Sequence, residues 1–352
     1  MKSIYVLYLC FFTFCGVSAT SATQAQTAIG VFKGAKSAVH PEWFKESFLD
    51  LEEDIADAAL ADKRLMVYFW QPGCPYCAEL ISNNLEIDEI KQKLQTKFDV
   101  VALNMWGDRE VIQVGGKAFT EKTLAAALNV NYTPTLLFFT ESRKIALRLD
   151  GYVAPERFSL ALDYVSGKHE KEYGFGQFVT ESLAQTTSPS QTGDLIREGF
   201  FAEDNNDLQK LINQSNSPIA VYFEKTDCDD CRNLHQNILI NKETRTLAEQ
   251  LPSIQIDIES EDALITPSGT KLTVKEWVQN LDIHYTPTIV FYTNDGLEIL
   301  RMDSMLKNFH VQSIFDYVSS EAYLHEPSFQ RFISERADRK ILTGEDVNIW
   351  SD

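Results

Sequence analysis

Short apolar runs bounded by polar or turn-forming residues recur along the chain, and they predict buried strands. In the first half of the chain these runs cover residues 65–70, 98–103, 135–140 and 144–149. The first run, LMVYFW, has no charged residue, as is typical of a fully buried strand. A hairpin is predicted over 110–119, because Gly115 and Gly116 stand at its centre.

Apolar residues at helical spacing lie between these runs. Residues 44, 48, 51, 55 and 59 are apolar, so we expect a helix over 43–60. Further helices are expected from Cys74 onward, over 121–128 and over 155–166. Strands that alternate with helices, followed by a hairpin and a last helix, indicate an α/β fold with a mixed central sheet flanked by helices.

The chain contains the same pattern twice. Residues 65–77 match 219–231 at an offset of 154, and 131–135 (NYTPT) match 284–288 (HYTPT) at an offset of 153. A hairpin over 263–272 and a helix capped by Thr273 and Glu276 repeat the first copy's elements. Two tandem copies of one domain are therefore expected. We place them at 28–181 and 195–335, with a polar linker at 182–194 and a C-terminal tail at 336–352.

The N-terminal residues 1–19 have the pattern of a secretory signal peptide. Lys2 precedes an apolar run over 4–17, and small residues follow at Ser18 and Ala19. The run of about 14 residues is shorter than the roughly 20 that a membrane-spanning helix needs. An uncleaved anchor is the alternative. We expect cleavage and a periplasmic or secreted location.

Composition narrows the function. The chain has 352 residues, which suits two domains at roughly 100–200 residues each. Its 51 Asp and Glu outnumber 32 Lys and Arg, and a net charge of −19 argues against nucleic-acid binding. Of six cysteines, the four outside the signal segment form two C-x-x-C pairs, and export would place them in an oxidising compartment.

The first pair, Cys74 and Cys77, follows a predicted strand and begins a predicted helix. Free N–H groups and the helix dipole stabilise a thiolate there, and Pro75 suits the first helical turn. Cys74 is thus the candidate attacking thiol, and Cys77, three residues on, the resolving one. A structural disulfide or half of a zinc site remains an alternative, although zinc ribbons space their pairs only about 15–20 residues apart.

The second pair, Cys228 and Cys231, is closely surrounded by acidic residues. Asp227, Asp229 and Asp230 all lie within two positions of Cys228. Like charge disfavours a thiolate, so slower attack is expected of Cys228. This pair could be a structural disulfide, a relay or a degenerate copy. His235, four residues after Cys231, is expected to be a packing residue.

Proline residues mark the start of two predicted strands. Pro134 and Pro287 follow Thr133 and Thr286 directly before apolar runs. A proline at the start of a buried strand is unfavourable, because it has no N–H to donate to a neighbouring strand. A cis peptide bond in a tight turn would solve this, and we expect one at each proline.

A strand, C-x-x-C, a helix and, about 60 residues later, Thr-Pro-Thr resemble the thioredoxin superfamily. The stretch 151–173 and the 110–119 hairpin are similar to the SoxW-type periplasmic thioredoxins, and Thr133 resembles the DsbC group. The resemblance implies dithiol–disulfide exchange without a metal or organic cofactor. It also implies protein thiols and disulfides as partners, and an electron donor of the DsbD or CcdA kind.

By the same resemblance, the redox cysteines and the cis prolines would be catalytic and their neighbours would contact substrate. The catalytic set is Cys74, Cys77, Pro134, Cys228, Cys231 and Pro287. The substrate-binding set is Thr133, Pro75, Tyr76 and Thr286. One departure is that Tyr68 and Tyr222 stand where many cytosolic thioredoxins have a buried Asp. Glu79 or Glu224 is then the candidate substitute.

Two hypotheses follow. The first is an exported thiol–disulfide oxidoreductase, a reductase more than an oxidase, with the first domain as the main catalyst. The second is a non-catalytic scaffold that binds partner peptides in the two proline grooves. The intact C-P-Y-C of the first copy favours the former.

Overall fold

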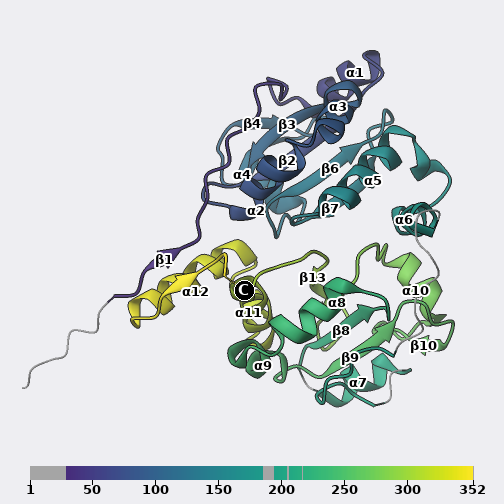
Figure 1. The fold of residues 1–352 in the computed structure, drawn as a ribbon, viewed down its shortest axis with the longest axis vertical. Coiled ribbons are helices and arrows are strands. Elements are labelled where there is room, and N and C mark those ends of the chain that lie inside the picture. Colours follow the sequence, from purple (N-terminus) through teal and green to yellow (C-terminus); the bar gives the residue numbers. More distant parts are fainter. Residues whose placement is uncertain (1–28, 185–193, 204–205, 216, 352) are drawn as a thin grey trace, which may run out of the picture.

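Two four-stranded mixed sheets form the centres of two domains in the computed structural model, which describes residues 29–184, 194–203, 206–215 and 217–351 (Figure 1). The first sheet has the order β3-β2-β6-β7 and the second the order β13-β12-β8-β9. In the first sheet β2 pairs in parallel with β3, in the second β8 pairs in parallel with β9, and all other pairs of these two sheets are antiparallel. The repeat predicted from the sequence is confirmed. The proposed signal peptide lies outside the described residues.

The strands agree closely with the apolar runs. Those of the first sheet are β2 (Arg64–Trp70), β3 (Phe98–Asn104), β6 (Thr135–Phe139) and β7 (Ile145–Asp150). Those of the second are β8 (Ile219–Glu224), β9 (Ser253–Asp257), β12 (Thr288–Tyr292) and β13 (Glu298–Met302). Two hairpins are present where predicted: β4 (Glu110–Ile112) with β5 (Ala118–Thr120), and β10 (Ala263–Ile265) with β11 (Lys271–Thr273).

Helices cover both faces of each sheet (Figure 1). The first domain has α1 (Leu51–Leu60), α2 (Pro75–Glu79), α3 (Asp88–Lys97), α4 (Glu121–Ala127), α5 (Pro155–Ser166) and α6 (Phe175–Ala184). The second has α7 (Leu208–Ser215), α8 (Asp229–Asn233), α9 (Lys242–Ala248), α10 (Val274–Asn280), α11 (Asn308–Ser319) and α12 (Phe329–Leu342). Single π turns, Leu80–Asn84 and Leu234–Ile238, continue α2 and α8, and short 3-10 turns lie at His169–Lys171 and Ala322–Leu324. Among the described helices, none is long and apolar enough to cross a bilayer.

The first helix is shorter than predicted. It begins at Leu51 rather than at residue 43, because the Asp50 side chain accepts hydrogen bonds from the N–H groups of Glu52 and Glu53 and caps the helix there. Leu49 has a φ of +65°, which no helix continues through. The capping box of Thr273 and Glu276 is present as predicted.

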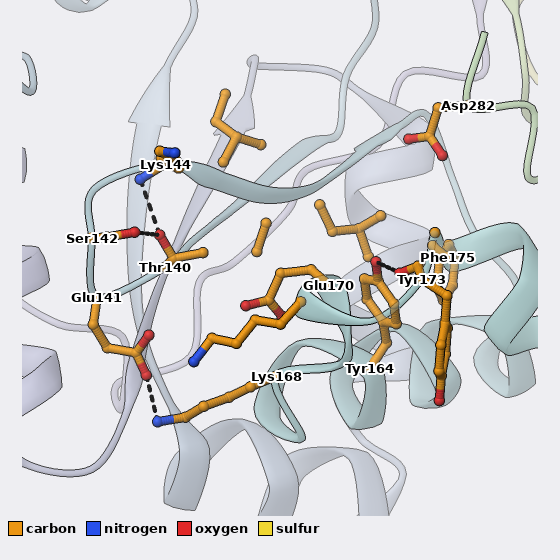
Figure 2. A pocket seen from close by; sticks show the side chains of 15 residues that line it. Thr140, Glu141, Ser142, Lys144, Tyr164, Lys168, Glu170, Tyr173, Phe175 and Asp282 are labelled. Carbon is orange, nitrogen blue, oxygen red and sulfur yellow. Dashed lines mark hydrogen bonds and ion pairs between the residues drawn. The ribbon is translucent and has the colours of Figure 1, made fainter. Parts of the chain in front are cut away.

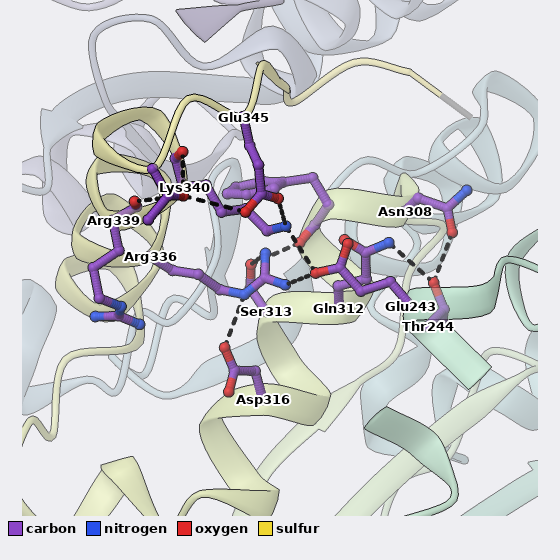
Figure 3. Close-up of polar contacts among 12 residues, drawn as sticks. Glu243, Thr244, Asn308, Gln312, Ser313, Asp316, Arg336, Arg339, Lys340 and Glu345 are labelled. Atoms are coloured by element: carbon purple, nitrogen blue, oxygen red, sulfur yellow. Dashed lines mark hydrogen bonds and ion pairs between the residues drawn. The ribbon is translucent and has the colours of Figure 1, made fainter. Parts of the chain in front are cut away.

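The C-terminal residues do not form a separate tail. Residue 336, where we expected the tail to begin, lies inside α12. Arg336 is buried and bonds Asp316 on α11 and Glu243 on α9, as Figure 3 shows. Beyond α12, β14 (Val347–Asn348) pairs in parallel with β1 (Phe32–Lys33) near the N-terminus. The end of the chain thus joins the N-terminal strand to the second domain.

The last helix of each domain packs against the other domain. Helix α6 of the first domain approaches the loop before β12, where Phe175 and His284 have ring centroids 5.4 Å apart. Helix α12 of the second approaches the loop before β6 (Figure 1). Helix α6 also extends past residue 181, the end we expected for the first domain, and residues 185–193 of the proposed linker lie outside the described part of the chain.

Candidate redox sites

Cys74 stands at the N-terminal end of α2, at the end of a short turn from β2. Gly73 makes this turn with a φ of +77°, a conformation that suits glycine. Cys74 is the N-cap residue, Pro75 is the first helical residue, and the Cys77 N–H lies 3.0 Å from the Cys74 Sγ. Cys74 and Cys77 form a disulfide. Cys77 is fully buried, whereas Cys74 retains 5% exposure, so Cys74 is the more accessible of the two residues.

The loop before β6 lies directly against Cys74. The peptide bond between Thr133 and Pro134 is cis, as predicted. The carbonyl oxygen and the hydroxyl of Thr133 each lie 3.3 Å from the Cys74 Sγ. The structure therefore brings together Cys74, Cys77, Thr133 and Pro134 from two segments that are about 60 residues apart.

The second domain repeats this geometry. Cys228 and Cys231 form a disulfide, and the Cys231 N–H lies 3.0 Å from the Cys228 Sγ. The bond between Thr286 and Pro287 is also cis, and the Thr286 carbonyl oxygen lies 3.4 Å from the Cys228 Sγ. The C-D-D-C pair thus has the same backbone setting as C-P-Y-C.

The acidic residues beside Cys228 have partners that the sequence did not reveal. Asp229 pairs with Arg232 on the same helix. Asp230 accepts a hydrogen bond from the Tyr285 hydroxyl at 2.9 Å, and the guanidinium of Arg157, from the first domain, lies 5.4 Å from the Tyr285 ring. Burial lowers the pKa of Arg157 to about 10, so it is still a cation at neutral pH. The expected crowding of negative charge is therefore partly offset.

A buried ionic cluster lies behind α8. His235 is buried, with its Nδ1 2.8 Å from Glu198 and its Nε2 3.0 Å from Glu224. Burial opposes the charged imidazole, but the hydrogen bonds to the two carboxylates outweigh it and raise the pKa of His235. His235 is thus a packing residue, as expected, with an ionic role besides. Tyr68 and Tyr222 are also buried, as their place in the strands suggested.

The cavity beside Cys74 is built by both domains. It measures about 380 Å³, and Cys74, Pro75, Tyr76 and Thr133 line one side of it. The opposite side consists of residues from α11 and α12, together with Leu306 before α11 and Ile349 after β14. Sequence reasoning missed this second wall, because nothing in a repeat pattern shows which surfaces of two copies meet.

Polar contacts hold the two domains together around this cavity. The Tyr76 hydroxyl accepts a hydrogen bond from the Lys307 N–H at 2.8 Å and lies 3.4 Å from the His310 Nδ1. The Gln330 amide donates to the Asn131 carbonyl at 2.8 Å, and the Gln71 amide donates to both Thr133 and Gln330. Burial lowers the pKa of His310 to about 4, so its ring is neutral at pH 7.

A second depression lies mostly on the first domain, between the β6–β7 turn and the residues around α5 and α6, and Asp282 of the second domain also lines it (Figure 2). It measures about 910 Å³ and is lined by none of the C-x-x-C residues. Glu141 on its rim pairs with Lys168 and with the buried Arg64. These hydrogen bonds outweigh burial and lower the pKa of Glu141 to about 2. Within the described residues, no cluster of three or more His, Cys, Asp or Glu side chains could hold a metal ion.

Comparisons with known proteins agree with this architecture. A family model described as a thioredoxin-like domain matches residues 51–166 and again 206–319. No curated protein sequence matches significantly.

Solved structures that match each cover about one domain. A thioredoxin-fold protein from Helicobacter pylori is 18% identical, with 39% of this chain and 92% of that chain covered and a TM-score of 0.32. A thioredoxin from Thermus thermophilus is 24% identical (33% and 83% covered, TM-score 0.26). The periplasmic thioredoxin SoxS from Paracoccus pantotrophus is 23% identical (30% and 99% covered, TM-score 0.20).

Proposed function

Because the chain belongs to the thioredoxin-like domain family, we propose that it acts as an exported reductase of protein disulfides, with Cys74 and Cys77 as its main redox pair. The observation that supports this best is the position of Cys74. Its sulfur caps α2, has the Cys77 N–H at 3.0 Å and lies 3.3 Å from the loop that contains the cis proline.

In the reduced protein, the backbone N–H and the dipole of α2 would stabilise a Cys74 thiolate. The thiolate attacks one sulfur of a substrate disulfide, forms a mixed disulfide and releases the other substrate sulfur as a thiol. Cys77, as a thiolate, then attacks the Cys74 Sγ and releases the second substrate thiol. Two electrons pass to the substrate, and the disulfide of Cys74 and Cys77 forms.

The cycle requires a reductant that returns the pair to the dithiol. We propose an external dithiol donor, such as a membrane protein of the DsbD or CcdA kind. The second domain would serve as a relay or a weakly active copy. Its cysteines and cis proline repeat the geometry of the first domain, but Asp229 and Asp230 replace Pro75 and Tyr76.

Reduction of insulin by the full chain and a dithiol reductant tests this function. We expect Cys74→Ser to abolish most of the activity and Cys228→Ser to leave most of it. A chain that binds denatured peptides but reduces no disulfide, before and after both substitutions, would instead support the scaffold hypothesis.

A further inference from the structure

We propose that the cavity beside Cys74 is a substrate site formed by both domains, and that it selects an extended cysteine segment with a large apolar side chain next to the cysteine. The proposal deepens the reductase function proposed above and rests on it. It names the substrate feature that the second domain would recognise.

The wall opposite the redox sulfur is apolar and comes from the second domain and the end of the chain. It is formed by Phe309, Ile333, Ala337, Ile341 and Ile349. Phe32 in β1 and Ala35, two residues after that strand, also line the cavity. An apolar side chain placed against these residues would be removed from contact with water. Burial of the apolar surface of one leucine-sized side chain favours binding substantially.

The charges around the cavity favour an apolar group over an acidic one. Among the described residues that line it there is no Lys or Arg, and the only carboxylate is that of Asp338. His310 is neutral at pH 7, because burial lowers its pKa to about 4. A carboxylate on the substrate would therefore lose water without gaining a cationic partner.

The wall is held in a fixed position relative to Cys74. Gln330 on α12 donates to the Asn131 carbonyl, and Gln71 links Gln330 to Thr133. The ring of Phe329 packs edge-on against Tyr132. The same loop that touches the Cys74 sulfur is thus bonded to the helix that supplies the apolar wall.

The size of the cavity indicates what can enter. A volume of about 380 Å³ is near the lower end of the range for small-ligand pockets, roughly 300–1,000 Å³. It accommodates a few side chains but not the surface of a folded domain. The matching substrate is therefore an unfolded or extended segment around a single cysteine.

The test uses the reduced full chain with Cys228→Ser and Cys231→Ser, so that exchange occurs only at Cys74 and Cys77. The substrates are short peptides whose cysteine forms a mixed disulfide with the chromophore thionitrobenzoate, flanked by Leu, Ser or Asp. Attack at the mixed disulfide and resolution by Cys77 release one peptide thiol and one chromophore thiol, and oxidise the protein pair. We expect kcat/KM to be at least about tenfold higher for Leu than for Ser, and lowest for Asp.

Two exposed neighbours on α12 provide a matched pair of variants. Ser334 lines the cavity and Glu335 does not. We expect Ser334→Trp to remove the preference for Leu, because the indole fills the cavity, while Glu335→Trp keeps it. Asp338→Leu enlarges the apolar wall and should increase the preference for the Leu peptide. If Ser334→Trp does not fold, this second variant tests the proposal.

The possible outcomes distinguish failure of the proposed substrate site from failure of the proposed reductase function. Equal rates for the three peptides, or a Leu preference that both Ser334→Trp and Asp338→Leu leave unchanged, would overturn the proposed site while exchange at Cys74 continues. Absence of Cys74-dependent exchange with every peptide and with hydroxyethyl disulfide would contradict the reductase function itself.

Discussion

Phe329, on the last helix of the second domain, packs edge-on against Tyr132 of the first, with ring centroids 5.6 Å apart. The relationship is reciprocal, because Phe175 on the last helix of the first domain packs against His284 of the second at 5.4 Å. Tyr132 and His284 both lie in the loop that leads to a cis proline. Each domain thus supports the active-site loop of the other, which explains why one hydrophobic core includes residues of both.

The contact between Phe329 and Tyr132 predicts a large loss of stability for Phe329→Ala. Phe329 is almost fully buried, so its removal leaves a cavity and should cost about 3–5 kcal/mol in the free energy of unfolding. The matched control on the same helix is Leu342→Ala, since Leu342 is 70% exposed and should cost less than about 0.5 kcal/mol. Urea denaturation measures both, and equal losses would show that α12 is not anchored at Phe329.

The redox pairs and cis prolines were predictable from sequence because they are local. A strand, two cysteines and a Thr-Pro step follow one another in the sequence, and the same order occurs in both copies of the repeat. The helix expected over 43–60 was wrong at its start, because hydrophobic spacing does not show that Asp50 caps α1 or that Phe48 is exposed.

The wall beside Cys74 could not be predicted in the same way. Gln330 and Asn131 are 199 positions apart, and only the packing of the two domains brings them into hydrogen-bond contact. The segment 336–352 was mistaken for a tail for the same reason. Its apolar residues, such as Ile349, line the cavity together with residues far away in the sequence.

The roles proposed for the two cysteines of the first domain, Cys74 as the attacking thiol and Cys77 as the resolving one, predict different trapping behaviour. Cys77→Ser removes the resolving thiol and should accumulate mixed disulfides between Cys74 and substrates. Cys74→Ser should trap few and be inactive, since Cys77 is buried beneath Cys74. Non-reducing electrophoresis after acid quenching measures the trapped species. Equal trapping by both variants would contradict the assignment of roles.

The two domains meet at two carboxylates, Asp150 and Asp303, and the raised pKa of Asp303 should make stability depend on pH. Burial, and next the charge of Asp150, raise the pKa of Asp303 from 3.8 to about 7. Its buried Oδ1 has no hydrogen-bond partner among the described residues. The folded state therefore favours protonated Asp303, and this contribution is complete below about pH 4 and is lost as the pH rises through about 7.

Asp303→Asn should remove this dependence. We expect the difference in Tm between pH 5 and pH 8 to be smaller in the variant than in the unmodified chain. The increase in Tm caused by the substitution should be largest at pH 8. Asp295→Asn, in the exposed turn between β12 and β13, is the control and should leave the pH profile unchanged. A profile that Asp303→Asn does not alter would show that Asp303 is ionised throughout this range in the folded protein.

Export predicts a defined mature N-terminus. If the segment over residues 1–19 is a signal peptide, cleavage after Ala19 yields a chain that begins at Thr20. N-terminal sequencing of protein from the exported fraction measures this directly. Recovery of a chain that still begins with Met1 would instead support an uncleaved anchor.

The final prediction concerns the difference between the two attacking cysteines. Residues 71–78 around Cys74 include no acidic side chain, whereas three aspartates lie within two positions of Cys228. The helix dipole contributes only about 0.3–1 kcal/mol at an exposed site, so nearby carboxylates can cancel it. In the reduced protein, Cys74 should therefore react faster than Cys228 with iodoacetamide near neutral pH, and added salt should narrow the difference.

Arg157 provides a further test, because it places a cation from the first domain near the acidic helix α8. It lies over the Tyr285 ring, whose hydroxyl donates to Asp230. Arg157→Gln should slow alkylation of Cys228 by about two- to fivefold and leave Cys74 unchanged, as expected for the loss of about 0.3–1 kcal/mol of favourable charge interaction. Arg143→Gln, at the β6–β7 turn, is the control. If Cys228 instead reacts as fast as Cys74 at low salt, local carboxylates do not govern its reactivity, and the second domain must be regarded as a full catalyst.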